Sequence, residues 1–434
     1  MRFFISVLFL FNFIVLTAQN CPDGRYRERV FSNIEITQDL VYGQVDPYDG
    51  RGRTDLEDIK LDFYAPAGDT LQKRPLVVMC FGGGFILGEK DDSDMVAWCD
   101  SLAHRGYACA SIDYRKGFNV LSQRSSTRAV YRAVQDLRAA IRYLQEDPDN
   151  LGFNIDANNI FIGGESAGAI TALQTAFLNE EADRPLETFE KERGGGNEAI
   201  DLGCLDCSGN DYEQPVEIKG ILSMWGAVND LQQIEADEQI PTFMVHGTLD
   251  QIVPYKKGRP FNLLYYPKVY GSKLIKERMD ELGIYNELDA YRGNFSHTVY
   301  GVPNLTFPNR RWAGIFDQAQ HFLADVMECP AAPLADETND FKLKIANAPS
   351  VEKTAIEKLW VQEKQLHLQL NVDEQQTIQV VVFNVNGQLL YEKQHQVTSG
   401  LNQLNIDITN WQSGNYFVKF ISGNSVETQQ FFTK

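Results

Sequence analysis

The feature of this 434-residue chain that most constrains its fold is an alternation of short buried strands with longer helices. Residues 75–81, 108–113 and 159–163 are predicted to be strands covered on both faces, because apolar side chains dominate them. Helices are predicted between them at 95–105 and at 125–146, where apolar residues recur at helical spacing. Strands that alternate with helices form parallel β–α–β units. The sequence therefore predicts an α/β fold with a mostly parallel central sheet flanked by helices.

The same pattern continues on both sides of these elements. Residues 30–66 are predicted to form strands and turns, since residues 59–64 alternate between apolar and polar side chains as a half-buried strand does. One α/β domain is therefore predicted over residues 20–327. Its remaining predicted elements are a small-residue helix at 167–178, strands at 218–225, 242–246 and 287–291, and a last helix at 311–327.

The first 19 residues have the pattern of a signal peptide. Arg2 precedes an almost wholly apolar stretch, residues 3–16, and residues 17–19 are small or polar, as a cleavage site requires. The alternatives are an uncleaved membrane anchor and a lipid anchor on Cys21. No later segment is apolar enough to span a bilayer. We therefore expect a mature protein without a stable membrane span, secreted or held at the cell surface.

The charge balance argues against one class of partner. The formal net charge is −19, whereas nucleic-acid binding depends on clustered Lys and Arg that neutralise phosphates. An acidic excess is typical of an extracellular protein that must stay soluble. No nucleic-acid partner is therefore predicted.

The cysteines suit an exported chain but do not reveal their pairing. An exported protein can form disulfides, and an odd number leaves at least one cysteine without a partner in the chain. Cys80 is the best candidate for a free thiol, because it lies in a buried strand. Cys204 and Cys207 form a C-x-x-C without a second pair or a His cluster, so a local disulfide or two free thiols is favoured over zinc. No metal site and no cofactor is predicted. The seven are Cys21, Cys80, Cys99, Cys109, Cys204, Cys207 and Cys329.

Three segments depart from the α/β pattern. Residues 179–217 form an insertion that is far longer than an ordinary connection, and it is expected to be either a functional cap or a disordered insertion. Residues 328–354 are predicted to be a linker, on their Ala, Pro and Asp content. Residues 355–434 show short strands, turn residues and no helical period. They are predicted to form a separate small all-β sandwich domain.

The strongest chemical motif follows the strand at 159–163. Residues 164–168 read Gly-Glu-Ser-Ala-Gly and match G-x-S-x-G, the nucleophile elbow. The motif alone is a weak signal, but here it follows a buried strand and opens a small-residue helix, which is its proper setting. Glycine is needed on either side because the turn is tight and side chains there would meet neighbouring backbone. Ser166 is therefore the candidate nucleophile.

A glycine run at the end of an earlier strand supports this prediction independently. The backbone N–H groups of Gly83, Gly84 and Ala167 are the candidate oxyanion hole, because glycines allow close approach to a developing negative charge. The alternative for the glycines is a plain flexible loop. Phe85 and Glu165 adjoin these positions and are candidate substrate-binding residues, although Glu165 could equally be structural.

The base and the acid follow from their order along the chain, which is Ser, then acid, then His in this arrangement. His297 lies in a loop between a predicted strand and the last helix, and it is the only well-placed histidine of the six. Asp250 follows the strand at 242–246, where a short loop can direct its carboxylate to His297. Asp230 is the second candidate for the acid. His246 is better explained as structural.

These motifs together resemble the α/β-hydrolases, over residues 30–327. They are similar to carboxylesterases of the type B and hormone-sensitive-lipase-like groups in Gly82–Phe85, Asp113–Arg115, Gly164–Gly168 and His246–Asp250. The resemblance implies a serine esterase that cleaves carboxylic esters. The alternatives are a serine peptidase, an esterase directed at a polymer such as acetyl-xylan, feruloylated polysaccharide or polyester, and a non-catalytic adhesin.

The tail resembles a second family. Residues 382–390, 413–418 and 431–434 are similar to the C-terminal sorting domain of proteins exported by the type IX secretion system. The resemblance implies that the secretion machinery is a partner of this protein. The alternative is a carbohydrate-binding β-sandwich.

Overall fold

The computed structural model describes Cys21 and most of the chain beyond it. The described residues are 21, 24–46, 55–178, 180–189, 201–301, 309–329, 355–362, 364–372, 375–384, 389–409, 411, 414–422 and 425–433. The predicted signal peptide, and residues 330–354 of the predicted linker, lie outside this set. The chain divides into two compact units, Met1–Val299 with Ile315–Pro333 and Tyr300–Gly314 with Leu334–Lys434.

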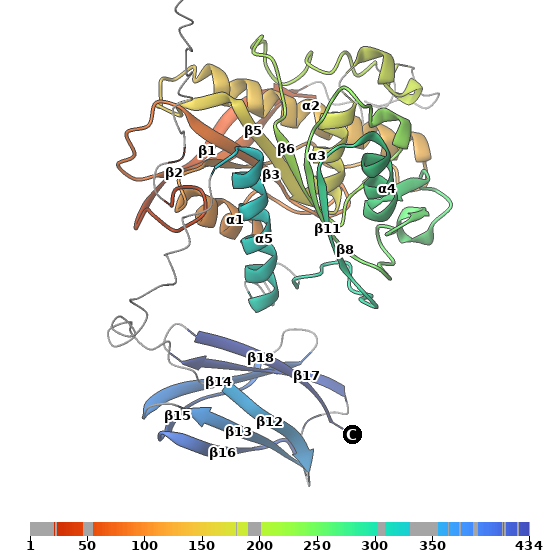
Figure 1. Ribbon diagram of the computed structural model, residues 1–434. Coiled ribbons are helices and arrows are strands. Elements are labelled where there is room, and N and C mark those ends of the chain that lie inside the picture. The colour runs from red at the N-terminus through yellow and green to blue at the C-terminus, as the bar shows by residue number, and fades with distance from the viewer. Residues whose placement is uncertain are drawn as a thin grey trace, which may run out of the picture. The chain divides into compact units, whose positions relative to one another are not determined.

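An eight-stranded sheet forms the centre of the first unit (Figure 1). The antiparallel pairs are β1 with β2 and β2 with β4, and every other neighbouring pair in this sheet is parallel. The predicted mostly parallel sheet is therefore confirmed. In spatial order the strands are β1 (Ile34–Val45), β2 (Glu57–Pro66), β4 (Ala108–Ile112), β3 (Arg74–Cys80), β5 (Ile155–Glu165), β6 (Gly220–Met224), β8 (Thr242–Gly247) and β11 (Asn286–Tyr291).

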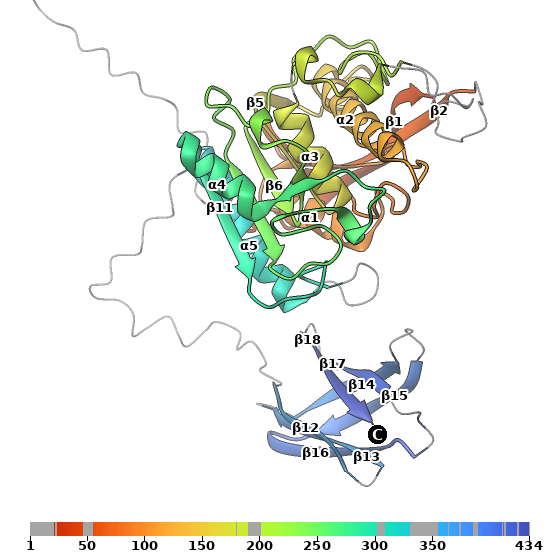
Figure 2. The same ribbon diagram turned by 90° about the vertical axis from the view of Figure 1, so that its right-hand side faces the viewer.

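Helices cover both faces of this sheet, as Figures 1 and 2 show. Each predicted helix is present, and one was not predicted: α4, whose segment is mostly charged and has only Ser272, Ile275 and Met279 buried. The helices are α1 (Ser93–Ala103), α2 (Gln123–Glu146), α3 (Ala167–Phe177), α4 (Ser272–Leu282) and α5 (Arg310–Val326). The shorter elements are η1 (Glu181–Asp183), η2 (Leu186–Thr188), η4 (Leu231–Gln233), η5 (Pro260–Asn262), β7 (Ala227–Val228), β9 (Lys257–Gly258) and β10 (Val269–Gly271).

Helix α2 is buried on nearly all sides, which is unusual for a helix with many charged residues. Its N-terminus is capped by Ser122, whose side chain accepts a hydrogen bond from the Ser125 N–H. Its C-terminus ends at Asp147 in the left-handed region. It packs against α3, and its guanidinium groups at Arg128 and Arg142 are fully buried. A polar face that is buried in this way needs hydrogen-bond partners from another segment.

The second unit contains two antiparallel sheets. Side chains at alternate positions, among them Leu366, Leu368, Ile378 and Val380, are fully buried and form one core. The predicted small all-β sandwich is therefore confirmed. One sheet contains β12 (Ala355–Gln362), β13 (Gln365–Val372) and β16 (Gly400–Asp407), and the other contains β15 (Leu389–Val397), β14 (Gln376–Asn384), β17 (Gly414–Ser422) and β18 (Ser425–Thr433).

Two disulfides join four of the cysteines. One links Cys21 to Cys329 across 308 positions, and the other is the local bridge between Cys204 and Cys207. Cys80 is free and buried, as predicted, and so are Cys99 and Cys109. Among the described residues, no helix combines the length and the apolar composition needed to cross a membrane.

Candidate active site

The turn between β5 and α3 holds Ser166 in a strained backbone conformation, with φ 52° and ψ −114°. Its N–H donates to the Met224 carbonyl at 2.9 Å, which fixes the turn to β6. The glycines of the motif have a steric reason. A Cβ at Gly164 would lie 2.4 Å from the Cys80 carbonyl oxygen, and one at Gly168 would lie 2.0 Å from the same atom. Only glycine allows α3 to start this close to β3.

The three residues predicted to form a triad meet at this turn. Nε2 of His297 lies 2.7 Å from Oγ of Ser166, and Nδ1 of His297 lies 2.7 Å from Oδ2 of Asp250. Ser166 and Asp250 are buried, whereas the His297 side chain is 17% exposed. A hydroxyl, an imidazole and a carboxylate in this order can carry a proton away from the hydroxyl and stabilise the imidazolium that results.

The Asp250 carboxylate is held in its ionised form. Its Oδ1 accepts hydrogen bonds from the N–H groups of Ile252 and Val253, at 2.7 and 3.1 Å. Burial alone would raise the pKa of Asp250, but hydrogen bonds from His246 and His297 lower it to about 2. The carboxylate is therefore charged at neutral pH and can hold the imidazole in one orientation.

Asp230, the second candidate for the acid, and His246, which precedes Asp250, have other hydrogen-bond partners. Asp230 is exposed, and its carboxylate accepts the Gln232 N–H at 3.0 Å at the start of η4. His246 is fully buried, with Nδ1 2.8 Å from Oγ of Ser272 and Nε2 3.0 Å from the Val253 carbonyl. Asp230 is thus engaged in local structure, whereas His246 also contacts the Asp250 carboxylate, with Nε2 3.5 Å from Oδ2.

The glycine loop, residues 82–84, lies beside the nucleophile, but only one of its two candidate oxyanion-hole glycines borders the cavity at Ser166. Gly84 and Ala167 line the same cavity as Ser166, and Gly83 is not among its lining residues. Gly83 has φ 112°, and a Cβ there would lie 2.2 Å from the Leu87 carbonyl oxygen. Its own carbonyl accepts the Leu87 N–H at 3.0 Å, which tightens the loop. Ala167 also begins α3, where the helix dipole favours negative charge.

The two candidate substrate-binding residues lie in different surroundings. Phe85 lines the cavity, and its ring centroid is 6.1 Å from that of Tyr114. Glu165 does not line the cavity: it is 4% exposed, and a Cβ at Gly82 would lie 3.4 Å from its Cγ. Burial raises the pKa of Asp94, which shares a hydrogen bond with Glu165. The Glu165 carboxyl therefore lies beside that of Asp94 beneath the glycine loop, which agrees with the structural alternative for this residue.

The cavity beside Ser166 encloses about 890 Å³, including its open mouth, and no charged side chain is among its described lining residues. Sequence reasoning missed most of its walls. The apolar positions of α2 could not be told from ordinary core positions, and residues 252–269 carry no motif. Apart from Ser166, Gly84, Phe85 and Ala167, the lining consists of Phe118, Ser126, Thr127, Val130, Tyr131, Val134, Ile170, Gln174, Leu178, Pro185, Ala227, Asn229, Ile252, Val253, Pro260, Phe261, Tyr266, Pro267 and Val269.

The part of the chain that the structure describes contains no set of side chains suited to bind a metal ion. No group of three or more His, Cys, Asp or Glu side chains there is arranged to hold an ion.

Comparison with known proteins gives two family matches. Residues 61–240 match the BD-FAE family, and residues 362–434 match the secretion system C-terminal sorting domain. Carboxylesterase 1C of Rattus norvegicus is 34% identical over 113 residues, which cover 26% of this chain. The match covers only 20% of the length of that relative.

Solved structures of an esterase from Thermogutta terrifontis are also similar. Esterase 2 phosphonylated by cyclosarin has a TM-score of 0.44 and 19% identity, covering 68% of this chain and 95% of that one. The propionate-bound form has a TM-score of 0.43 and 20% identity, covering 65% of this chain and 94% of that one. By its two family matches, the chain is similar to the BD-FAE family over residues 61–240 and to the secretion system C-terminal sorting domain over residues 362–434.

Proposed function

We propose that this protein is an exported serine esterase that hydrolyses carboxylic esters through an acyl-enzyme on Ser166. The observation that carries the proposal is the hydrogen-bonded series from Ser166 through His297 to Asp250, with both distances at 2.7 Å. The nucleophile lies at a cavity whose described lining is uncharged. Such a site suits a neutral ester with an apolar acyl group.

The reaction begins with attack of the Ser166 oxygen on the ester carbonyl carbon, while Nε2 of His297 takes the hydroxyl proton. The carbonyl oxygen becomes an oxyanion, which the N–H groups of Gly83, Gly84 and Ala167 stabilise. As the tetrahedral intermediate collapses, the C–O bond to the alcohol breaks and His297 returns its proton to the departing oxygen. Water then attacks the acyl-enzyme by the same steps in reverse order, which releases the acid.

The match of the tail to a sorting domain supports a site of action outside the cell. A secretion system sorting domain is recognised by export machinery, and we propose the type IX system as that machinery, with a signal peptide at residues 1–19 for the first step. Delivery to the surface or medium would follow.

The proposal is tested with Ser166→Ala and an activity-based phosphonate. The wild-type protein should hydrolyse an aryl acetate and gain one covalent phosphonyl group on Ser166, located by mass spectrometry. Ser166→Ala should lose both, because no other group replaces the nucleophile, while its circular dichroism stays unchanged. Turnover of the ester by well-folded Ser166→Ala at the wild-type rate would refute the assignment. Faster turnover of an aminoacyl anilide than of the matched ester would favour the peptidase alternative.

A further inference from the structure

One face of α2 carries five buried side chains that can form hydrogen bonds. Arg128, Tyr131, Gln135, Arg138 and Arg142 recur at intervals of three or four residues, so they share one side of the helix. All are buried, and all except Arg138 are fully so. Buried polar groups in folded proteins are hydrogen-bonded almost without exception.

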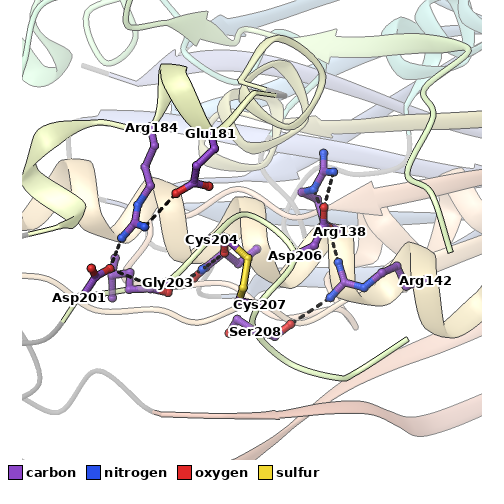
Figure 3. Close-up of a disulfide and its surroundings, with 12 residues drawn as sticks. Arg138, Arg142, Glu181, Arg184, Asp201, Gly203, Cys204, Asp206, Cys207 and Ser208 are labelled. Atoms are coloured by element: carbon purple, nitrogen blue, oxygen red, sulfur yellow. Dashed lines mark hydrogen bonds and ion pairs between the residues drawn. A yellow bond between two sulfur atoms is a disulfide. The ribbon is translucent and has the colours of Figure 1, made fainter. Parts of the chain in front are cut away.

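Most of the partners come from residues 201–208, a segment that we call the disulfide loop because the Cys204–Cys207 bridge lies within it (Figure 3). Backbone carbonyls of this loop act as acceptors for the side chains of α2. Tyr131 Oη donates to Gly203 O at 2.9 Å, Gln135 Nε2 donates to Leu202 O and Cys204 O at 2.8 Å each, and Arg142 Nη2 donates to Ser208 O at 3.1 Å.

Ion pairs fasten the loop at two further points. Arg138 donates to both oxygens of Asp206, at 2.9 and 2.7 Å, and Arg142 pairs with the same carboxylate (Figure 3). Burial would raise the pKa of Asp206, but the hydrogen bond and charge of Arg138, together with Arg142, lower it. At the start of the loop, Asp201 pairs with Arg184. The loop is thus docked on α2 between residues 202 and 208, and on Arg184 through Asp201.

The apolar contact of this loop faces the catalytic cavity. Leu205, between the two bridged cysteines, is 4% exposed and packs in one cluster with Tyr131, Val134 and Leu178. Those three residues are themselves walls of the cavity. Leu205 is therefore the layer directly behind the wall, and the disulfide loop closes the cavity from outside.

The wall formed by Tyr131, Val134 and Leu178 lies at the end of α3 that is far from the nucleophile. Ala167, Ile170, Gln174 and Leu178 all line the cavity at intervals of three or four residues. With a rise of 1.5 Å per residue, this line extends about 16 Å from the elbow to the residue that ends the helix. The region that Leu205 supports is therefore the distal end of the cavity.

We propose that this distal end is an acyl-binding subsite for uncharged apolar chains, and that the disulfide loop, through Leu205, sets the longest chain that it accepts. The inference rests on the proposed ester hydrolysis and adds the substrate's acyl class and the residue that limits its length. We assign the cavity to the acyl part of the ester, and not to its alcohol part, because His297 is not among the residues that line it. His297 must protonate the departing alcohol. The alcohol leaves toward His297, and the acyl chain extends the other way along α3.

The test is a series of p-nitrophenyl esters from acetate to dodecanoate, with kcat/KM measured for each. In Leu205→Ala, Tyr131 and Val134 lose the support behind them, and the distal end gains room for one or two methylene groups. The ratio of kcat/KM for long over short esters should then rise roughly tenfold, because each methylene buried is worth about fourfold. Cys204→Ser with Cys207→Ser, which loosens the loop without removing Leu205, should shift the profile in the same direction.

Two matched controls separate this effect from general loss of stability. Leu102→Ala removes the same atoms from the fully buried face of α1, away from the cavity walls. Cys21→Ser with Cys329→Ser removes the other disulfide. Both should lower the midpoint of thermal unfolding and keep the wild-type chain-length profile.

The outcomes distinguish the inference from the proposed function. If the wild-type protein hydrolyses no ester, the proposed function fails and the inference with it. If it hydrolyses esters but Leu205→Ala keeps the wild-type profile, only the role of the disulfide loop is overturned. If a parallel series of acetates with alcohols of increasing length shows that Leu205→Ala changes selectivity for the alcohol and not for the acyl chain, the acyl assignment is overturned.

Discussion

Oδ2 of Asp250 lies 2.7 Å from Nδ1 of His297, although 47 positions separate the two residues. The sheet explains the meeting. Asp250 follows the carboxyl end of β8 and His297 follows that of β11, and these two strands are parallel neighbours. Loops after adjacent parallel strands emerge at the same edge of a sheet, which is where ligands bind in α/β folds. Ser166 follows β5 at the same edge.

This relationship predicts unequal effects for the two candidate acids. Asp250→Asn should lower kcat for an aryl ester by roughly 10⁴-fold, because the amide no longer holds the imidazole in its working tautomer. Asp230→Asn should stay near the wild-type rate, since Asn caps a helical turn about as well as Asp. Steady-state kinetics on both purified variants measure the difference. Equal or reversed losses would show that Asp250 is not the acid.

The lowered pKa of Asp250 also predicts how stability depends on pH. The pKa is about 2 in the folded protein, against an ordinary value of 3.8. A carboxyl of this kind stabilises the fold above its unfolded-state pKa, and that contribution is lost as the pH falls through the folded-state pKa. Between about pH 4 and pH 2, the free energy of unfolding should therefore fall by about 2 kcal/mol more in the wild-type protein than in Asp250→Asn.

Urea denaturation at a series of pH values measures this difference. All other carboxyl groups are common to the two proteins, so their contributions cancel in the comparison. Parallel pH dependences would mean that Asp250 is not held ionised in the fold.

The sequence predicted the features that depend on neighbouring residues and missed those that depend on distant contacts. The strands at 75–81 and 159–163 and the motif around Ser166 are short-range patterns, and the sequence predicted the α/β architecture and the order of elements from them. Helix α4 was missed because it buries only three of its side chains, which leaves no clear apolar period. For Glu165 the sequence left a substrate-binding role and a structural role open, and only the fold shows that Asp94 lies against it.

The cavity and the disulfide loop could not be predicted for a related reason. Both depend on contacts between segments that are far apart in the chain, such as Arg142 with Asp206, 64 positions away. Burial of four arginines on α2 contradicts the ordinary preference of that side chain for the surface, so hydropathy gives no hint of a docked loop. The Cys204–Cys207 spacing indicated a local bridge, but not that Leu205 between them supports a cavity wall.

The close contact beneath the elbow predicts a large effect for one glycine. Gly168→Ala should lower stability by more than about 2 kcal/mol, because its Cβ would meet the backbone of β3 and α3 would have to move. Gly314→Ala is the matched control, since a Cβ at that helical position meets no atom within 4 Å. It should raise stability by about 0.5–1 kcal/mol. Thermal and urea unfolding measure both. A Gly168→Ala protein as stable as the wild type would show that the elbow is not packed on β3 as described.

The tail predicts a separation between activity and location. A chain that ends near residue 345 should keep full turnover of a soluble aryl ester, because Ser166, Asp250 and His297 all lie before residue 300 and Cys329 is retained for its disulfide. The same chain should no longer reach the surface or medium of a host with the type IX system, because residues 362–434, the sorting domain, are missing. Both lengths are expressed in such a host, and periplasm, surface and medium are assayed with the soluble ester.

A carbohydrate-binding module would behave differently, since its loss spares export and weakens activity only on an insoluble polymer. Export of the shortened chain as efficient as that of the full chain would therefore overturn the sorting role and favour the binding module.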